Sequence, residues 1–211
     1  MKKIKIGLFD FCKTLVKINT LSEFVKFCLD NKSSNVVDKN LKKILINIKP
    51  ILARFRLCSS RQLEIKLLSG FTKDTLYRLG EEFYYNVIKN NFNDVVIEEF
   101  YKLKNKGYVT IIISAALDVY LNYIQNDLPF DKIICTELSF NEKGICLGKV
   151  KGIDPVGEGK IVKLKASLEY FDNIDFENSY FFTDDPIGDK SILQIVGNGF
   201  IVENNKIRLW K

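Results

Sequence analysis

From residue 94 onward, short apolar runs rich in β-branched residues alternate with amphipathic stretches of helical period. The runs predict strands at 109–113, 132–136, 180–183 and 200–202, a hairpin at 137–140 and 145–150, and a first strand at 3–9. The stretches between them predict helices at 95–106, 117–125, 160–170 and 191–196. Strands that alternate with helices usually form a parallel sheet with helices on both faces. The sequence therefore predicts an α/β fold.

Residues 18–92 interrupt this alternation with a segment of helical character. Thr20 and Glu23 have the spacing of a capping box, which predicts the start of a helix. Apolar stripes at 41–48 and 63–68 predict two more helices, although 44–48 also fits the period of a strand. Thr72 precedes a fourth apolar stripe and predicts a further helix start. We therefore expect two parts: a core of 1–17 and 93–211, and a helical insertion of 18–92.

The positive charge of the chain is concentrated in that insertion. The whole sequence has a formal charge of +6, from 32 Lys and Arg against 26 Asp and Glu. Residues 18–92 contain 13 Lys and Arg against 7 Asp and Glu, and the rest of the chain is balanced. A solvated surface, steering of an anionic substrate and nucleic-acid binding would each explain the excess. No known nucleic-acid-binding motif accompanies it, so a nucleic-acid partner is the least favoured explanation.

The chain has no histidine, and its five cysteines include no CxxC pair. These facts exclude Ser-His-Asp and Cys-His catalysis and argue against a structural zinc site or a disulfide framework. Buried, reduced thiols in a cytoplasmic protein are the simplest interpretation of the cysteines. The longest apolar stretch, around 109–117, is too short to span a bilayer, so no membrane association is expected. The sequence leaves the oligomeric state open.

Reactive side chains follow three of the predicted strands: Asp10, Ser114 and Asp185. In open parallel sheets, ligands bind beyond the carboxyl ends of the strands. Two carboxylates placed there suit Mg²⁺, which takes few protein ligands and retains water and phosphate oxygens. A carboxylate can also act as a nucleophile and carry a phosphoryl group, and this chemistry needs no histidine.

Four segments, in order along the chain, resemble the motifs of the haloacid dehalogenase superfamily. The first is Asp10-Phe-Cys-Lys-Thr14, which resembles the DxDxT loop. The second is the apolar strand that ends at Ser114-Ala115, and the third is Lys160 at the start of a helix. The fourth is Asp185 with Asp189 four residues later. Together they cover nearly the whole chain. The position of residues 18–92 resembles the phosphoserine phosphatase-like branch, which implies a Rossmann-like core with an inserted all-helical cap.

The resemblance implies a role for each matching residue. Asp10 would be the nucleophile and a Mg²⁺ ligand, with the Cys12 backbone carbonyl and Asp185 as further ligands and Asp189 in support. Ser114 and Ala115 would bind the phosphoryl group, Lys160 would neutralise its charge, and Thr14 would hold the loop. Two assignments stay open: Asp184 could replace Asp185 as the ligand, and Lys163 or Lys165 could be the motif lysine. A small phosphorylated substrate is implied.

Cys12 is the departure from the family pattern. Phosphatases of this superfamily have Asp at that position, where it protonates the leaving group and later activates water. A thiol is a poor substitute for a carboxylic acid in that role. The sequence therefore allows a slow Mg²⁺-dependent phosphohydrolase, a degenerate member that binds metal and a phosphorylated ligand without turnover, or a basic module that binds a polyanion through the cap.

Overall fold

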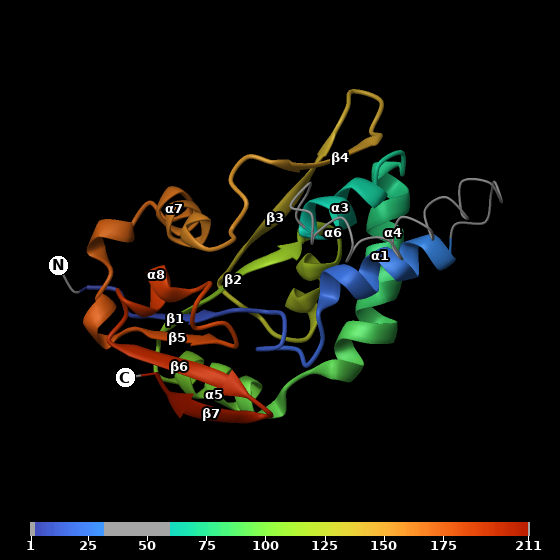
Figure 1. Ribbon diagram of the computed structural model, residues 1–211. Helices are drawn as coiled ribbons and strands as arrows, with labels where there is room; N and C mark the ends of the chain where they lie inside the picture. The colour runs from blue at the N-terminus through green and yellow to red at the C-terminus, as the bar shows by residue number, and fades with distance from the viewer. Residues whose placement is uncertain (1–2, 32–59, 211) are drawn as a thin grey trace.

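The computed structural model describes residues 3–31 and 60–210, and in these residues seven strands form a single sheet (Figure 1). The order across the sheet is β4-β3-β2-β1-β5-β6-β7. The strands β1, β2, β3, β5 and β6 pair in parallel, whereas the two edge strands β4 and β7 are antiparallel to their neighbours. The strand bounds are β1 Ile6–Phe9, β2 Val109–Leu117, β3 Lys132–Phe140, β4 Cys146–Lys151, β5 Tyr180–Thr183, β6 Asn198–Glu203 and β7 Lys206–Leu209.

The register of the central strands aligns the ends that carry reactive residues. Phe9 is paired with Ile112 on β2 and with Phe182 on β5. The next residues along the three strands therefore lie side by side: Asp10, 113–114 and 183–184. This is the edge at which parallel sheets bind ligands.

Helices cover both faces of the sheet, as predicted. Side chains alternate along β1, so Phe9 belongs to one apolar cluster with Phe100 of α5, while Leu8 belongs to another with Leu164 of α7. Helix α8 joins α7 on the second face through Ile192. The core helices and short helical turns are α5 Asp94–Asn105, α6 Asp118–Leu121, α7 Glu158–Ser167 and α8 Lys190–Leu193, with 3₁₀ turns at Asn122–Asn126, Phe171–Asn173 and Phe176–Asn178.

Several predicted boundaries in the core are wrong. Strand β2 does not end at residue 113 but continues to Leu117, and the predicted helix 117–125 is a short α6 followed by a 3₁₀ turn. The pairing of β2 with β3 shifts between Ile113 and Leu117, where residues 114–116 of β2 lie opposite one residue of β3, and we call this irregular segment, which contains Ser114, the bulge. The predicted strand 132–136 and the first arm of the hairpin are one strand, β3. Strand β7 was not predicted.

The insertion is helical where the structure describes it, and the predicted helix at 41–48 lies outside the described residues. Thr72 accepts a hydrogen bond from the backbone N–H of Thr75 and caps α4 as predicted. The capping box at Thr20 is wrong, because α1 begins at Thr20 itself, Asn19 is the N-cap and no side chain caps the helix. The bounds are α1 Thr20–Asp30, α3 Ser60–Leu67, α4 Lys73–Phe83, a π-helical turn Tyr84–Ile88 and a 3₁₀ turn Lys89–Asn91.

The insertion packs tightly on the β3–β4 hairpin and on α6. Backbone hydrogen bonds join Cys146 to both Gly70 and Phe71. Tyr120 of α6 forms a cluster of three mutually contacting rings with Phe24 and Phe83, at centroid distances of 4.9 and 5.6 Å from them, and these two rings are 5.3 Å apart. One apolar cluster therefore crosses the predicted boundary between the two parts. The division into 1–17 with 93–211 and 18–92 stays a prediction.

Two further expectations concern thiols and membranes. Cys12, Cys28, Cys135 and Cys146 are free thiols, and Cys58 lies outside the described residues. Among the described helices, none is long and apolar enough to cross a membrane.

Candidate active site

A pocket of about 310 Å³ lies at the carboxyl ends of β1, β2 and β5, and we call it the strand-end pocket. Residues from all four motifs line it, although they are far apart in the sequence. Of the predicted site residues, its lining includes Asp10, Cys12, Ser114, Ala115, Lys160, Asp185 and Asp189. Asp184 and Lys13 line it as well. The fold thus brings together every predicted site residue except Thr14.

Lys160 is the charged centre of this pocket. Its Nζ lies 3.2 Å from a carboxylate oxygen of Asp10 and 2.7 Å from Asp189, and the lysine is only 4% exposed. Burial acts to lower the pKa of Lys160, but the charges of Asp10 and Asp189 outweigh it and the net shift is upward. Lys160 therefore stays a cation between the two acids.

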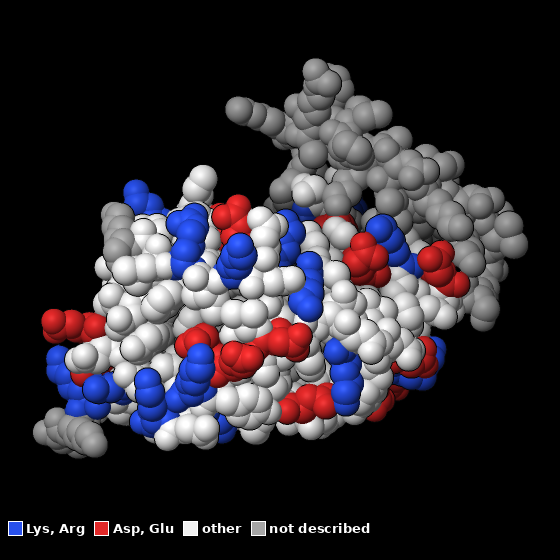
Figure 2. All heavy atoms as spheres, turned by 90° about the horizontal axis from the view of Figure 1, so that it is seen from below, with Lys and Arg blue, Asp and Glu red and all other residues white. Residues whose placement is uncertain are grey.

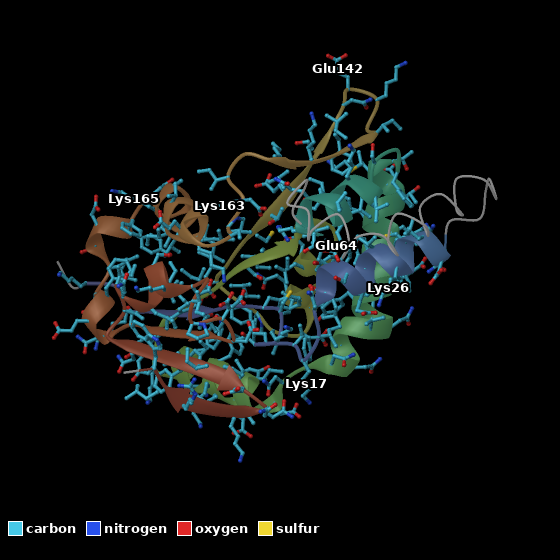
Figure 3. All side chains as sticks on the ribbon, viewed as in Figure 1. Lys17, Lys26, Glu64, Glu142, Lys163 and Lys165 are labelled. Carbon is cyan, nitrogen blue, oxygen red and sulfur yellow. The ribbon has the colours of Figure 1, made fainter. Side chains whose placement is uncertain are left out.

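The other two lysines of α7 lie elsewhere (Figure 3). The Nζ of Lys163 donates a hydrogen bond to the Cys135 carbonyl at 2.5 Å. Lys165 is exposed and lies over the ring of Phe171. Among the three candidates, only Lys160 lines the strand-end pocket.

Thr183, which the sequence did not single out, helps to fix the fourth motif. Its hydroxyl donates to a carboxylate oxygen of Asp189 at 2.5 Å and accepts from the backbone N–H of Asp185 at 3.0 Å. Asp189 is thus held by Thr183 and Lys160 together. The only sequence signal for this role is the place of Thr183 at the end of a predicted strand.

Asp184 and Asp185 are in different environments. One oxygen of Asp185 accepts hydrogen bonds from the backbone N–H groups of Ile187 and Gly188, at 3.2 and 2.8 Å. This carboxylate therefore folds back on its own turn. Asp184 has a pKa raised from 3.8 to about 6, first because it is partly buried and then because it feels the charge of Asp10. Asp184 thus lies near enough to Asp10 to feel its charge, whereas Asp185 is engaged with its own turn.

The bulge in β2 shapes the second motif. Ser114 is 1% exposed, and its hydroxyl accepts a hydrogen bond from the backbone N–H of Ala116 at 3.3 Å. Bulged residues leave the regular ladder, so their side chains and amides can turn toward a neighbouring site. Ser114 and Ala115 both line the strand-end pocket by way of this bulge.

The Cys12 thiol is connected to a hydroxyl group of the insertion, on Thr20, and through it to the hydroxyl group of Tyr120. Its Sγ lies 3.0 Å from the Thr20 hydroxyl, which lies 3.0 Å from the Tyr120 hydroxyl. Burial, with a further contribution from the charge of Asp10, raises the pKa of Cys12 to about 11. The thiol is therefore protonated at neutral pH, and it is a weaker acid than a carboxyl group by many orders of magnitude.

Thr14 supports the loop that carries Asp10, but through its backbone. The Asn93 side-chain amide donates to the Thr14 carbonyl at 3.1 Å, and the Asn93 backbone N–H donates to the Leu15 carbonyl. The Thr14 hydroxyl is buried without a hydrogen-bond partner among the described residues. Sequence reasoning missed Asn93, which gives no local signal beyond its place before a predicted helix.

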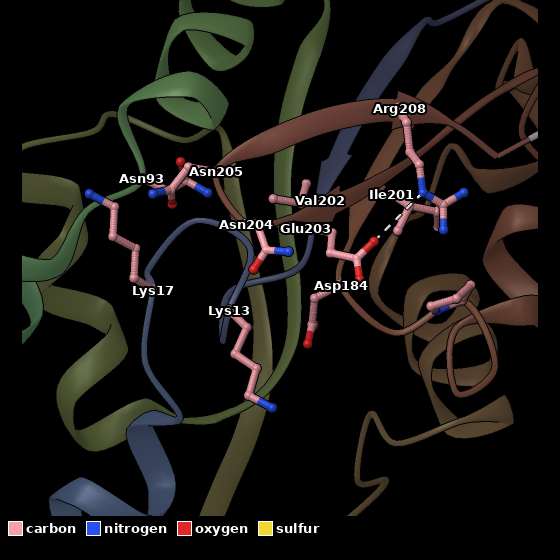
Figure 4. Close-up of a pocket in the computed structure, with 11 residues that line it drawn as sticks. Lys13, Lys17, Asn93, Asp184, Ile201, Val202, Glu203, Asn204, Asn205 and Arg208 are labelled. Atoms are coloured by element: carbon pink, nitrogen blue, oxygen red, sulfur yellow. Dashed lines mark ion pairs between the residues drawn. The ribbon is translucent and has the colours of Figure 1, made fainter.

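A second hollow of about 500 Å³, the outer pocket, adjoins the strand-end pocket (Figure 4). Lys13 and Asp184 line both pockets. The outer pocket is closed on its far side by the β6–β7 turn and by the ion pair of Arg208 with Glu203 at 3.9 Å. Asp184 thus stands on the wall between the two pockets.

The lining of the strand-end pocket fits a hard cation. Four Asp side chains face two Lys side chains, so the lining is acidic overall. In the described part of the chain, no three or more Cys, Asp and Glu side chains are grouped as a metal centre. The carboxylates of the lining offer oxygen ligands. Mg²⁺ uses a few such oxygens when water and phosphate oxygens complete its shell.

Comparison with known proteins agrees with this geometry. The family model for haloacid dehalogenase-like hydrolases matches residues 8–194. This chain belongs to the haloacid dehalogenase-like hydrolase family. Within that family it is similar to members of the phosphoserine phosphatase-like branch. A phosphoserine phosphatase from Methanocaldococcus jannaschii is 26% identical over 170 residues, which are 80% of this chain and 72% of that protein.

Solved structures show the same fold for this haloacid dehalogenase-like hydrolase. A protein of unknown function from Bordetella pertussis Tohama I has a TM-score of 0.76 and 18% identity, covering 93% of this chain and 89% of its own. A phosphoserine phosphatase solved as a phospho-aspartyl intermediate analogue has a TM-score of 0.59 and 22% identity, covering 94% and 86%. The predicted α/β core with a helical insertion is confirmed.

Proposed function

We propose that this haloacid dehalogenase-like hydrolase is a Mg²⁺-dependent phosphatase that cleaves a phosphate monoester of a small metabolite through an aspartyl phosphate on Asp10. The observation that carries the proposal is the meeting of Asp10, Ser114 and Lys160 in one small pocket at the strand ends. The relative with 26% identity is a phosphoserine phosphatase, so phosphoserine is the first substrate to test.

The first step is attack by a carboxylate oxygen of Asp10 on phosphorus. A P–O bond forms to Asp10, the P–O bond to the leaving group breaks, and the leaving oxygen takes a proton from solvent water, which is returned to solvent when the second step consumes its own water. Water then attacks the phosphorus of the aspartyl phosphate, which releases inorganic phosphate and restores the Asp10 carboxylate. Lys160 pairs with the Asp10 carboxylate and holds it in place, and it offers a positive charge to the phosphoryl oxygens. Ser114 and the backbone amides of the bulge are the hydrogen-bond donors for those oxygens.

Mg²⁺ would be held by Asp10, the Cys12 carbonyl and one of the adjacent acids Asp184 and Asp185. When bound, it supplies positive charge that stabilises the transferring phosphoryl group. The spacing to Asp189 favours Asp185, whereas the contacts favour Asp184, because two backbone amides already hold the Asp185 carboxylate. We therefore propose Asp184 as the ligand and Asp185 as the residue that shapes the turn.

The test is phosphate release from a panel of phosphate monoesters with Mg²⁺ and with EDTA. Asp10→Asn should abolish release, and Asp172→Asn, at an exposed acid in a 3₁₀ turn, is the matched control. Acid-quenched wild-type protein should carry a hydroxylamine-labile phosphoryl group that Asp10→Asn lacks. Unchanged turnover in Asp10→Asn would remove Asp10 as the nucleophile.

A second candidate is a binding protein without turnover, and the state of Cys12 favours it. The residue two after Asp10 carries a protonated thiol engaged with Thr20, where a carboxyl group would supply acid and base catalysis. This candidate predicts that phosphate with Mg²⁺ raises the melting temperature while no monoester of the panel is hydrolysed. Release of phosphate at a rate well above the uncatalysed rate would exclude it.

The third candidate, a module that binds polyanions through the cap, gains nothing from the described residues. The segment 32–59 holds seven Lys and Arg against one Asp and so carries the whole charge excess of the insertion. This segment lies outside the described residues. On the face shown in Figure 2, basic and acidic side chains are interspersed.

A further inference from the structure

Arg61 of α3 connects the insertion to the core at a point next to the strand-end pocket. Its guanidinium donates two parallel hydrogen bonds to the two carboxylate oxygens of Asp154, from Nε at 3.0 Å and from Nη2 at 2.9 Å. The same Nη2 donates to the Thr136 hydroxyl at 2.8 Å. The side chains of Arg61 and Asp154 are only 21% and 29% exposed. A bidentate, partly buried pair of this kind fixes geometry in a way that exposed ion pairs do not.

Thr136 carries this connection to the phosphoryl-binding segment. It is fully buried at the point where β3 resumes its pairing with β2, opposite Leu117. Its hydroxyl accepts from Arg61 and can give its one proton to Asp154 at 2.5 Å or to the Ala115 carbonyl at 3.2 Å. Ala115 lies in the bulge, where the regular ladder is interrupted. When Thr136 gives its proton to the Ala115 carbonyl, this contact ties the segment of Ser114 and Ala115 to the Arg61 cluster.

Asp154 carries the connection to the opposite wall and to Lys160. The residues after it, 155–157, line the strand-end pocket and lead into α7. A Cβ atom on Gly159 would lie 2.3 Å from the Asp154 carbonyl oxygen, so the first turn of α7 rests directly on Asp154. Lys160 is the next residue. A shift of Asp154 would thus move residues 155–157 of the pocket wall together with the backbone of Lys160.

We propose that Arg61 is a positioning residue, which holds Thr136 and Asp154 so that the Ser114-Ala115 bulge and the start of α7 face each other across the strand-end pocket. The inference rests on the proposed function of that pocket. In Figure 1, α3 lies beside the β3–β4 arm. The pocket for the phosphoryl group is therefore complete only while α3 is seated on the core.

Four substitutions test the proposal. Arg61→Met keeps the length of the stem but removes every donor, and Arg61→Lys keeps the charge but cannot form the fork. Thr136→Val keeps the shape and removes the hydroxyl, whereas Thr136→Ser keeps the hydroxyl. The control is Arg78→Met, because Arg78 lies on α4 and pairs with Glu82 of the same helix in an exposed position.

The first readout is the split between kcat and KM for the best monoester, at a temperature at which circular dichroism shows each variant fully folded. A misplacement of catalytic groups by about 1 Å can cost about 10²-fold in rate. We expect Arg61→Met and Thr136→Val to lower kcat by about that factor. Thr136→Ser should recover most of the loss, Arg61→Lys should not, and Arg78→Met should match wild type. A purely structural role would lower the melting temperature and leave kcat per folded molecule unchanged.

The second readout is the affinity for inorganic phosphate with Mg²⁺, measured by calorimetry, because it does not depend on turnover. Weaker phosphate binding in Arg61→Met and Thr136→Val than in wild type and Arg78→Met supports the proposal. If folded Arg61→Met and Thr136→Val keep kcat, KM and phosphate affinity within twofold of wild type, the proposal is overturned while the proposed function stands. If wild type neither hydrolyses a monoester nor binds phosphate, both are overturned.

Discussion

Replacing Asp184 with Asn should make the metal-free protein more stable while it removes metal binding. The pKa of Asp184 is raised from 3.8 to about 6, so the folded protein holds its proton more tightly than the unfolded chain does. Above about pH 6, the ionised Asp184 carboxylate therefore lowers the free energy of unfolding. This destabilisation disappears as the pH falls below the pKa of Asp184 in the unfolded chain, near 4. Asn keeps the shape of the side chain and cannot ionise.

The size of the effect follows from the shift. About two pKa units correspond to about 3 kcal/mol. Asp184 is only partly buried, and solvent screening reduces this to about 1–2 kcal/mol. For a chain of this length, such a gain raises the melting temperature by about 2–8 °C. We expect this increase in EDTA at pH 7.5, and we expect it to be absent at pH 4.

The assay is thermal unfolding followed by circular dichroism, with EDTA and then with excess Mg²⁺. Wild type should be stabilised by Mg²⁺ because the ion binds the folded state only, and Asp184→Asn should lose that stabilisation. Asp185→Asn is the matched variant: its amide oxygen can still accept from the N–H groups of Ile187 and Gly188, so it should keep both its stability and its response to Mg²⁺. If Asp185→Asn loses the response to Mg²⁺ and Asp184→Asn keeps it, the assignment from contacts is wrong and the one from spacing is right. A lower melting temperature of Asp184→Asn in EDTA at pH 7.5 would contradict the electrostatic reasoning.

Three more substitutions have defined outcomes. Cys12→Asp should raise kcat by about 10²–10⁴-fold, because it restores a carboxyl group for acid and base catalysis; phosphate-release assays showing no gain on any bound substrate would mean that the missing acid is not the obstacle. Gly188→Ala should cost about 0.5–1.5 kcal/mol, because the new Cβ would lie 2.4 Å from an Asp185 oxygen and displace that carboxylate from its hydrogen bonds to the turn; denaturant unfolding with an unchanged midpoint would refute this argument. Thr72→Ala should cost about 1 kcal/mol through the lost cap of α4 while kcat and KM stay at wild-type values, and a change in kcat would show that this cap also influences the pocket.

The central sheet was predictable because its strands are buried on both faces. Such strands are continuous apolar runs, and the runs at 3–9, 109–113 and 180–183 correspond to β1, the first part of β2 and β5. Their parallel pairing places the following residues at one edge, which is why Asp10 and Ser114 could be expected together. Strand β7 gave no such signal, since its residues are mostly exposed and the turn before it is Asn204-Asn205.

Contacts between distant segments were beyond the reach of sequence patterns. Arg61 and Asp154 are separated by 93 positions, and neither stands in a recognisable motif. The same holds for Asn93, which supports the loop at Thr14 from 79 positions away. The prediction at Thr20 failed for a related reason: its hydroxyl is used by Cys12 and Tyr120, so a tertiary contact replaced the local capping box. The local sequence shows which hydrogen bonds a side chain such as Thr20 can form, and tertiary packing determines which of them it forms.

The cluster of the Tyr120, Phe24 and Phe83 rings has a consequence for how the chain unfolds. These three side chains are fully buried and come from α6 of the core and from α1 and α4 of the insertion. Neither the core nor the insertion could therefore bury its own aromatic side chains without the other. Loss of the insertion would expose apolar area of the core, and the reverse is also true. Chemical denaturation should therefore give one cooperative transition, with the same midpoint whether it is followed by tyrosine fluorescence or by far-ultraviolet circular dichroism. Two separate midpoints would show that the insertion and the sheet unfold independently.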